Sequence, residues 1–226
     1  MLISLFRGQL DFASALVEVA AILVIVFLIL PFHEWAHAFT ASKLGDTSVK
    51  YSGRLTLNPL AHIDPFGALA LLLFGFGWAK PVPVDTRNFK KPKLGMAIVA
   101  LMGPVANIVA AIAGGLILNA LVKFAPDLFK SQAGMYVYLF FSFYVQVNVS
   151  LAVFNLLPIP PLDGSKIVFV FLPDKWVYKF YQYQQIISIV LIVLLFTGVL
   201  TVPLSFLSGY VLRFVSWISA LPFSFF

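Results

Sequence analysis

The stretch Val19–His37, which reads VAAILVIVFLILPFHEWAH, decides how this chain folds. Val19–Leu30 is apolar without interruption. With the residues before it, this run reaches the length of about 20 that a helix needs to cross a bilayer. Three ionisable side chains, His33, Glu34 and His37, follow directly. The stretch predicts a membrane-spanning helix from about residue 12 to 31 that continues to about residue 44 and carries polar chemistry near one end.

The composition of the whole chain agrees with a membrane protein. Of its 226 residues, 61% are hydrophobic and 11% are charged, against about 45–50% and about 25% in soluble proteins. The net charge of +6 comes from basic residues that lie between apolar runs, so they are interpreted as topology signals and lipid contacts. No nucleic-acid partner is expected. The chain has no cysteine, which leaves His, Asp and Glu as ligands for any metal.

Three further apolar runs predict spans, so the expected fold is an all-α polytopic membrane protein with about four full transmembrane helices. The runs are about 94–122, 135–157 and 185–202. One membrane-embedded domain over residues 1–226 is expected, with a catalytic core at about 12–172. The C-terminal helix and tail occupy about 185–226, and the tail could span, gate or lie on the membrane.

Smaller insertions are expected between the first two long spans. Residues 66–78 are apolar but too short to cross a bilayer, and they contain Gly67, Gly75 and Gly77. A short re-entrant segment fits them better than a span. Alternating residues and turn signals at 48–57 and 81–85 predict small β-strands or a hairpin near the cytoplasmic face.

Basic residues predict the orientation of the chain. They gather on the side where the first span ends, at Lys43, Lys50, Arg54, Lys80, Arg87, Lys90, Lys91 and Lys93. The opposite side holds Arg7, Lys123 and Lys130. Because basic loops remain in the cytoplasm, the N-terminus is expected outside and His33 and His37 nearer the cytoplasmic face.

His33-Glu34-Trp35-Ala36-His37 has the pattern H-E-x-x-H. On a helix, residues four apart share a face, so both imidazoles can reach one metal ion. Glu34 lies beside that face and can accept a proton from a metal-activated water. The alternative is a pair of core histidines satisfied by hydrogen bonds, which is costly at the end of an apolar span.

A third ligand must come from elsewhere, because catalytic zinc usually has three protein ligands and one open position. Asp163 follows the proline-rich stretch Asn155–Pro161, which would end the third span at a similar depth. It could be a ligand or a helix N-cap for the residues from Ser165 onward. His62 is the remaining histidine. It could replace Asp163 as a ligand or act near the cavity as a hydrogen-bonding residue.

The pairing of HEWAH with the later NLLPIPPLDG (155–164) resembles the site-2 protease family of intramembrane zinc metalloproteases. The stretches GRLTLNPLAHIDPFG (53–67), GWAKPVPVDTRNFKKPK (77–93) and GPVAN (103–107) resemble its compact bacterial members. The resemblance covers about residues 33–166. No PDZ or CBS domain is expected, since no polar stretch is long enough.

The resemblance implies one zinc ion per chain, held by His33, His37 and Asp163, with Glu34 as the catalytic acid and base. It also implies that Asn155 lies near the site, where its amide could bind substrate or the developing oxyanion. Asn107 is a second candidate for that role, or else an interhelix packing residue. The expected partners are a lipid bilayer and a transmembrane protein substrate, in a bacterial inner or plasma membrane; the oligomeric state is left open.

The expected reaction is hydrolysis of a peptide bond within or near the substrate's transmembrane segment. An unwound substrate would enter beside the third span and pair with the strand-like segments at 48–57 and 81–85. The alternatives are an ion or solute transporter, a catalytically inactive membrane binding protein, and another membrane zinc hydrolase such as a prenyl-protein protease. The absence of an internal repeat counts against a transporter built from inverted halves.

Overall fold

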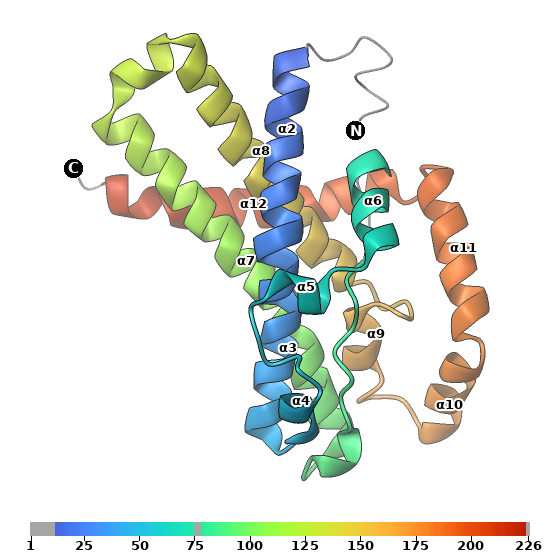
Figure 1. Ribbon diagram of the computed structural model, residues 1–226. Coiled ribbons are helices and arrows are strands. Elements are labelled where there is room, and N and C mark those ends of the chain that lie inside the picture. The colour runs from blue at the N-terminus through green and yellow to red at the C-terminus, as the bar shows by residue number, and fades with distance from the viewer. Residues whose placement is uncertain (1–11, 75–77, 225–226) are drawn as a thin grey trace.

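The computed structural model describes residues 12–74 and 78–224 (Figure 1). Its first element is a 33-residue helical rod, Phe12–Leu44. The rod consists of α2 (Phe12–Val24), the π-helical turn η1 (Ile25–Ile29) and α3 (Leu30–Leu44). Pro31 lacks the N–H that would continue the regular hydrogen-bond ladder, and the wider turn lies directly before it. The predicted first span is therefore confirmed, and the rod carries His33 and His37 in its C-terminal half.

Two more predicted spans are confirmed with similar bounds. They are α7 (Pro92–Phe124), of 33 residues, and α8 (Gln132–Asn155), of 24 residues. The 3-10 helix η3 (Pro126–Lys130) connects them. Both helices are long and apolar enough to cross a membrane.

The predicted fourth span at 185–202 has the wrong bounds. This region forms the 13-residue helix α11 (Gln184–Phe196), joined at a 65° bend to α10 (Asp174–Gln182). The fourth helix of spanning length is instead α12 (Thr201–Ser224), formed by the aromatic tail. Gly198, with φ +75°, lies between α11 and α12. Its left-handed conformation separates the two helices within the apolar run. The expected number of about four spans holds among residues 12–74 and 78–224, where four helices are long and apolar enough to cross a membrane, or five if α10 and α11 form one bent span.

The predicted β-strands at 48–57 and 81–85 are wrong. Residues Ser48–Tyr51 form the helical turn α4, and no strand ladder occurs among residues 12–74 and 78–224. The segment 81–85 is extended but cannot enter a ladder normally, because Pro81 and Pro83 have no N–H. A single antiparallel bridge joins Ile63 to Ala79.

The remaining short elements lie between α3 and α7. They are α5 (Pro59–His62), α6 (Pro65–Phe74) and η2 (Thr86–Asn88). With ten residues, α6 is about 15 Å long, so it cannot cross a bilayer. Gly75 and Gly77, which entered the re-entrant prediction, lie outside the described residues, as does Arg7.

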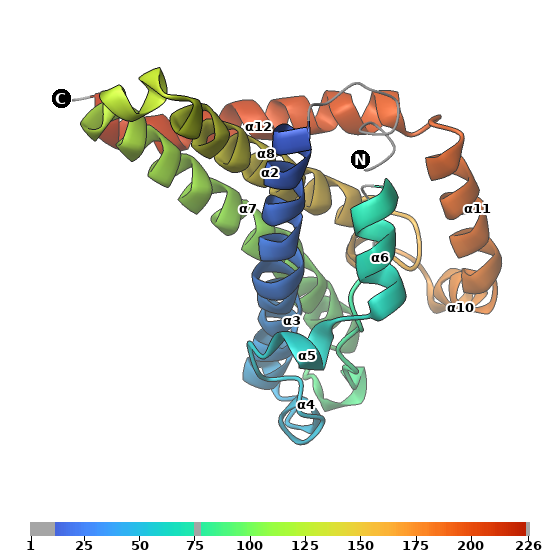
Figure 2. The same ribbon diagram turned by 45° about the horizontal axis from the view of Figure 1, so that its top comes forward.

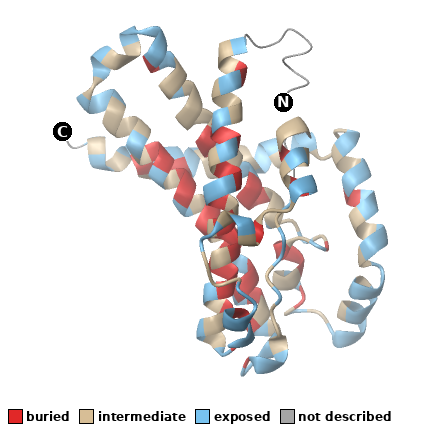
Figure 3. Ribbon diagram, in the orientation of Figure 1, coloured by how far each residue is buried: buried red, intermediate tan, exposed pale blue. Residues whose placement is uncertain are grey.

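The core lies where the rod α2–α3 contacts α7 and α8. Its buried residues include Ile22, Ile25, Ala111, Tyr144 and Val149. Buried residues gather along α3 and on the parts of α7 and α9 (Asp163–Val168) that face it (Figure 3). In both ribbon views α12 lies across the direction of α2 and against α7 and α8 (Figure 2).

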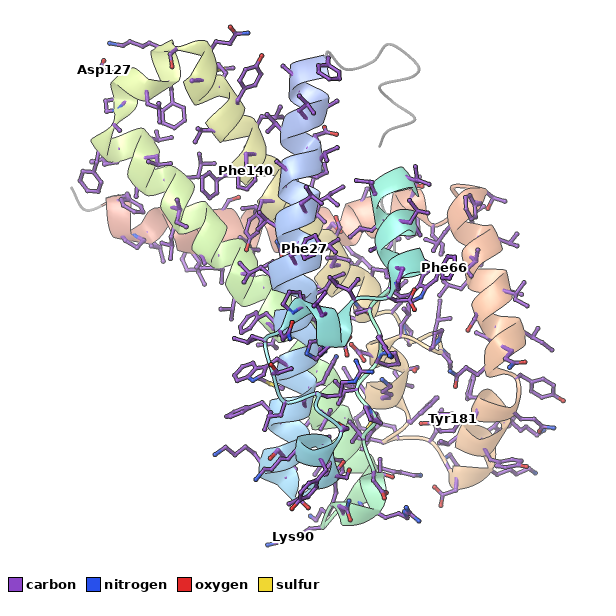
Figure 4. All side chains as sticks on the ribbon, in the orientation of Figure 1. Phe27, Phe66, Lys90, Asp127, Phe140 and Tyr181 are labelled. Atoms are coloured by element: carbon purple, nitrogen blue, oxygen red, sulfur yellow. The ribbon has the colours of Figure 1, made fainter. Side chains whose placement is uncertain are left out.

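Charged side chains lie at both ends of the molecule. Lys90 lies at one end, beside the lower part of α3, and Asp127 lies at the opposite end in η3 (Figure 4). Between them, apolar side chains on the rod face outward. Phe27, for example, is 49% exposed. A lipid environment accounts for this large exposed apolar surface, because a water-soluble protein rarely leaves contiguous apolar patches of such size exposed.

Candidate metal centre

Helix α3 brings His33 and His37 to one face, as their spacing predicted. Both side chains are buried, and their Nε2 atoms lie 3.0 Å apart. The rod continues past them to Gly45, which adopts φ +117° and ends the helix. The two imidazoles are thus held on a continuous helix rather than on a loop.

Asp163 joins them from a distant part of the sequence. It is the first residue of α9, and its Oδ2 lies 3.4 Å from His33 Nε2 and 3.2 Å from His37 Nε2. The N-cap alternative is wrong, because the N-cap of α9 is Leu162 and no side chain caps it. Gly164 allows α9 to begin here: a Cβ at this residue would lie 2.1 Å from the Leu156 carbonyl oxygen.

The three ligand atoms have the spacing of a metal site. All lie within 4.8 Å of one another. Ligands about 2.0–2.1 Å from a tetrahedral zinc ion would be about 3.3 Å apart, and the observed separations are 3.0, 3.2 and 3.4 Å. Two imidazole nitrogens and a carboxylate oxygen are also the donor types that zinc accepts. The described residues therefore fit this cation.

The second nitrogen of each imidazole indicates which nitrogen is free for a metal. His37 Nδ1 lies 2.7 Å from the carbonyl oxygen of Val99, and His33 Nδ1 lies 3.2 Å from Asn107 Oδ1. A carbonyl oxygen only accepts hydrogen bonds, so Nδ1 of His37 carries the proton and Nε2 keeps its lone pair. The same tautomer at His33 follows with the Asn107 amide oxygen as acceptor. Such outer partners orient metal-ligating histidines.

Gly103 makes room for the centre. A Cβ on this α7 residue would lie 2.4 Å from His37 Nε2 and 2.5 Å from His33 Nε2. No larger residue fits without moving the imidazoles. Gly103 belongs to the GPVAN stretch and lies four positions before Asn107, which places both on the face of α7 that meets α3.

Glu34 lies beside the three donors and has a main-chain partner. Its Oε2 accepts a hydrogen bond of 3.2 Å from the Val82 N–H. Val82 lies between two prolines, so its N–H is the one donor of the backbone at 81–83. The sequence carried no signal for this contact beyond the PVPV pattern itself.

The segment that carries Val82 is anchored at both ends. On one side the Lys80 N–H donates to the His62 carbonyl at 2.7 Å. On the other, the Asp85 N–H donates to Asp46 Oδ2 at 2.7 Å. Burial raises the pKa of Asp46, but hydrogen bonds from Ser48, Asp85 and Asn88 together hold it below its usual value. The charged carboxylate therefore fastens the segment to the end of α3.

A cavity of about 430 Å³ opens beside the donors. It is lined by residues of the rod, the extended segment, α7, α8, α9 and α11, among them Glu34, Val82, Asn155, Lys166 and Leu191. Asn155 lines it as expected, although its Nδ2 donates to the Leu151 carbonyl at 3.0 Å.

The other two candidates lie away from this cavity. Asn107 is fully buried, does not line the cavity and contacts His33 instead. His62 is also fully buried, with its Nε2 2.8 Å from the Thr56 carbonyl oxygen. Among the described residues, the donor cluster contains His33, His37 and Asp163 and does not include His62.

The fold and the site define a polytopic helical membrane protein with a buried His–His–Asp centre open to a cavity. The description "Peptidase family M50" belongs to the family model that matches residues 20–198. The chain therefore belongs to peptidase family M50, the site-2 protease family, and is a membrane-embedded peptidase.

Relatives agree with this membership. The chain is 42% identical over 177 residues to "Putative zinc metalloprotease YwhC" of Bacillus subtilis, covering 77% of this chain and 80% of the relative. It is 36% identical over 137 residues to "Putative zinc metalloprotease Rip2" of Mycolicibacterium smegmatis, covering 58% of this chain and 49% of that relative. No solved structure matches. The transporter and inactive-protein alternatives are not favoured.

Proposed function

We propose that this protein is an intramembrane zinc metalloprotease that hydrolyses a peptide bond within or near the transmembrane segment of a membrane protein. In this proposal His33, His37 and Asp163 hold one zinc ion. The convergence of these three side chains beside Glu34, at the wall of a cavity, carries the proposal. The relatives' names describe zinc metalloproteases, which supports zinc over other divalent metals.

Zinc held at this centre would lower the pKa of a bound water toward about 7 and polarise the scissile carbonyl. Glu34 accepts the proton of the attacking water while the water oxygen bonds to the carbonyl carbon. It then gives this proton to the leaving nitrogen as the C–N bond breaks. The Val82 N–H holds the Glu34 carboxylate facing the cavity in the meantime.

The substrate would approach through the cavity. A helical substrate hides its peptide carbonyls in its own hydrogen bonds, so it must unwind before it can be cut. The cavity is bounded on the α8 side by Leu151, Phe154 and Asn155, which supports entry beside this third span. Little pairing with residues 81–85 is expected through their N–H groups, because those of Val82 and Asp85 already donate to Glu34 and Asp46.

The orientation is part of the same proposal. The end of the molecule that carries Lys90 would face the cytoplasm of a bacterial cell, because basic loops stay there. The centre lies in α3, toward this end of the rod. Cleavage would then occur in the cytoplasmic half of the bilayer or at its edge.

The experiment compares the chain's two glutamates. Wild type, Glu34→Gln and the control Glu18→Gln are each co-expressed with a library of single-span membrane proteins. Glu34→Gln should keep its zinc but slow cleavage by about 10²–10⁴-fold, so that uncut substrates accumulate. Glu18→Gln should behave as wild type. Cleavage that persists in a clean preparation of Glu34→Gln would remove Glu34 from its role.

A second pair of variants tests the ligands. Asp163→Ala should lower the zinc content measured by elemental analysis, whereas Asp127→Ala, at the far end of the molecule, should not. An unchanged zinc content in Asp163→Ala would contradict the proposed ligand set and favour His62 as the third ligand.

A further inference from the structure

Lys166 is a charged side chain in an otherwise mostly apolar cavity. Of the described residues that line the cavity, it is the sole lysine or arginine. The exposed fraction of its side chain is 28%. A cation in this position, inside a membrane protein, is costly unless it is paired or used.

Lys166 is paired with the proposed metal ligand Asp163. Its Nζ lies 3.1 Å from Asp163 Oδ1, one turn along α9, while Oδ2 of the same carboxylate faces the two imidazoles. The carboxylate is thus shared between a cation on the cavity side and the donors of the metal centre. The ammonium group lies one carboxylate away from the centre, and the Lys166 side chain lines the cavity.

Asn107 does not line the cavity, so it is not placed to bind an oxyanion there. Asn155 donates one N–H of Nδ2 to the Leu151 carbonyl and keeps the other, but its amide is neutral. A fixed positive charge stabilises a developing oxyanion better than a neutral amide, and more so where water is scarce. Ammonium donors also rotate freely, so Lys166 can bond Asp163 and a substrate oxygen together.

We propose that Lys166 binds the oxyanion that forms on the scissile carbonyl, in addition to its ion pair with Asp163. This inference rests on the proposed function, because an oxyanion arises only if the protein hydrolyses an amide. In this inference Lys166 contacts the substrate, and zinc binding does not depend on it.

The test compares Lys166→Met and Lys166→Gln, which remove the charge, with Lys166→Arg, which keeps it. Lys175→Met on the exposed face of α10 is the control. Each full-length protein is loaded with zinc in detergent, and its zinc content and thermal unfolding are measured. Cleavage is then followed with a single-span protein that wild type cuts and Glu34→Gln does not.

The neutral variants should keep one zinc per chain and lose about 10²–10³-fold in kcat, with KM within about threefold. Lys166→Arg should recover at least part of kcat. In calorimetric titrations, acetohydroxamate, which binds metals as an anion, should bind the neutral variants about tenfold more weakly. Imidazole, a neutral ligand, should bind them as it binds wild type.

Other outcomes overturn the proposal. Loss of zinc from the neutral variants would assign Lys166 to holding Asp163. Equal weakening of acetohydroxamate and imidazole would indicate a structural role, and unchanged kcat would exclude the oxyanion contact. These results differ from a failure of the proposed function, in which zinc-loaded wild type would cut no more than Glu34→Gln.

Discussion

Helices α7 and α11 are both strongly apolar, yet they have opposite roles in the molecule. Half of the most apolar window of α7 is buried inside the protein, and the residues it buries include Gly103 and Asn107 of the metal centre. In α11, ten of thirteen residues are apolar, but Leu191 alone is buried. Apolarity alone does not say which of the two helices forms the metal centre.

The difference lies in side-chain size. Nine of the twelve buried residues of α7 are glycine or alanine, whereas α11 contains neither. Small residues let helices approach closely, and in lipid this packing, rather than burial from water, holds helices together. Close approach also brings α7 against the imidazoles of α3. Helix α11 instead forms one wall of the cavity, through Ser188, Leu191, Ile192 and Leu195.

The sharpest way to break this comparison is to add one carbon at the centre of α7. Gly103→Ala places a Cβ within 2.5 Å of both Nε2 atoms, so the two imidazoles must move from their positions. Changes to the hydrogen-bonding partners of metal ligands typically lower metal affinity by about 10–100-fold. The zinc affinity of Gly103→Ala should fall further than that. Gly209→Ala on α12, where a Cβ meets nothing within 4 Å, is the control, and elemental analysis is the measurement. Normal zinc in Gly103→Ala would mean that α7 does not constrain the centre.

A smaller effect is expected one turn further along α7. Asn107→Ala removes the partner of His33 Nδ1, so the imidazole can rotate and change tautomer. Zinc affinity, measured against a competing chelator, should fall by about 10–100-fold. Asn148→Ala is a matched control, since Asn148 is equally buried but donates to the Tyr144 carbonyl of its own helix. Equal losses in the two variants would attribute the effect to general destabilisation.

The third prediction concerns the segment 81–85, which precedes α7 and lines the cavity. Val82→Pro removes the one N–H that Glu34 accepts from this segment, and hydrogen bonds to charged groups contribute about 1.5–3 kcal/mol. The value of kcat should fall about tenfold, with zinc content unchanged. Val84→Pro puts the same ring two residues further on and leaves the Val82 N–H in place. If both variants lose the same activity, the shape of the segment matters and its hydrogen bond does not.

The smallest expected effect is a difference in the stability lost when a valine is shortened in α7 and in α11. Val99 of α7 is 1% exposed and Val193 of α11 is 53% exposed. Val99→Ala should cost about 2 kcal/mol and lower the melting temperature by about 4–8 °C. Val193→Ala should change stability by less than about 0.5 kcal/mol. Thermal unfolding of the purified proteins measures both, and similar shifts would show that α11 packs as tightly as α7.

Local patterns in the sequence were sufficient for much of the fold. The spans at α7 and α8 and the long rod were predicted because 20 or more apolar residues leave few alternatives in lipid. The strand predictions failed because alternation at 48–57 and 81–85 says nothing about a pairing partner. The bounds predicted for the fourth span were wrong because the chain turns at Gly198 inside an apolar run. Hydropathy does not depend on the backbone angles of a single residue.

The sequence by itself determined the membrane setting and the H-E-x-x-H pair, since both depend on residue type and short spacing. It left Asp163 as one of two candidate third ligands, and the family resemblance alone favoured it over His62. Only the tertiary structure decided which distant atoms meet: Asp163 with the imidazoles, Asn107 with His33 and the Val82 N–H with Glu34. These contacts join residues brought together by helix packing or by the start of α9, so each depends on side-chain size and backbone direction across several elements. Spacing along one chain carries neither quantity.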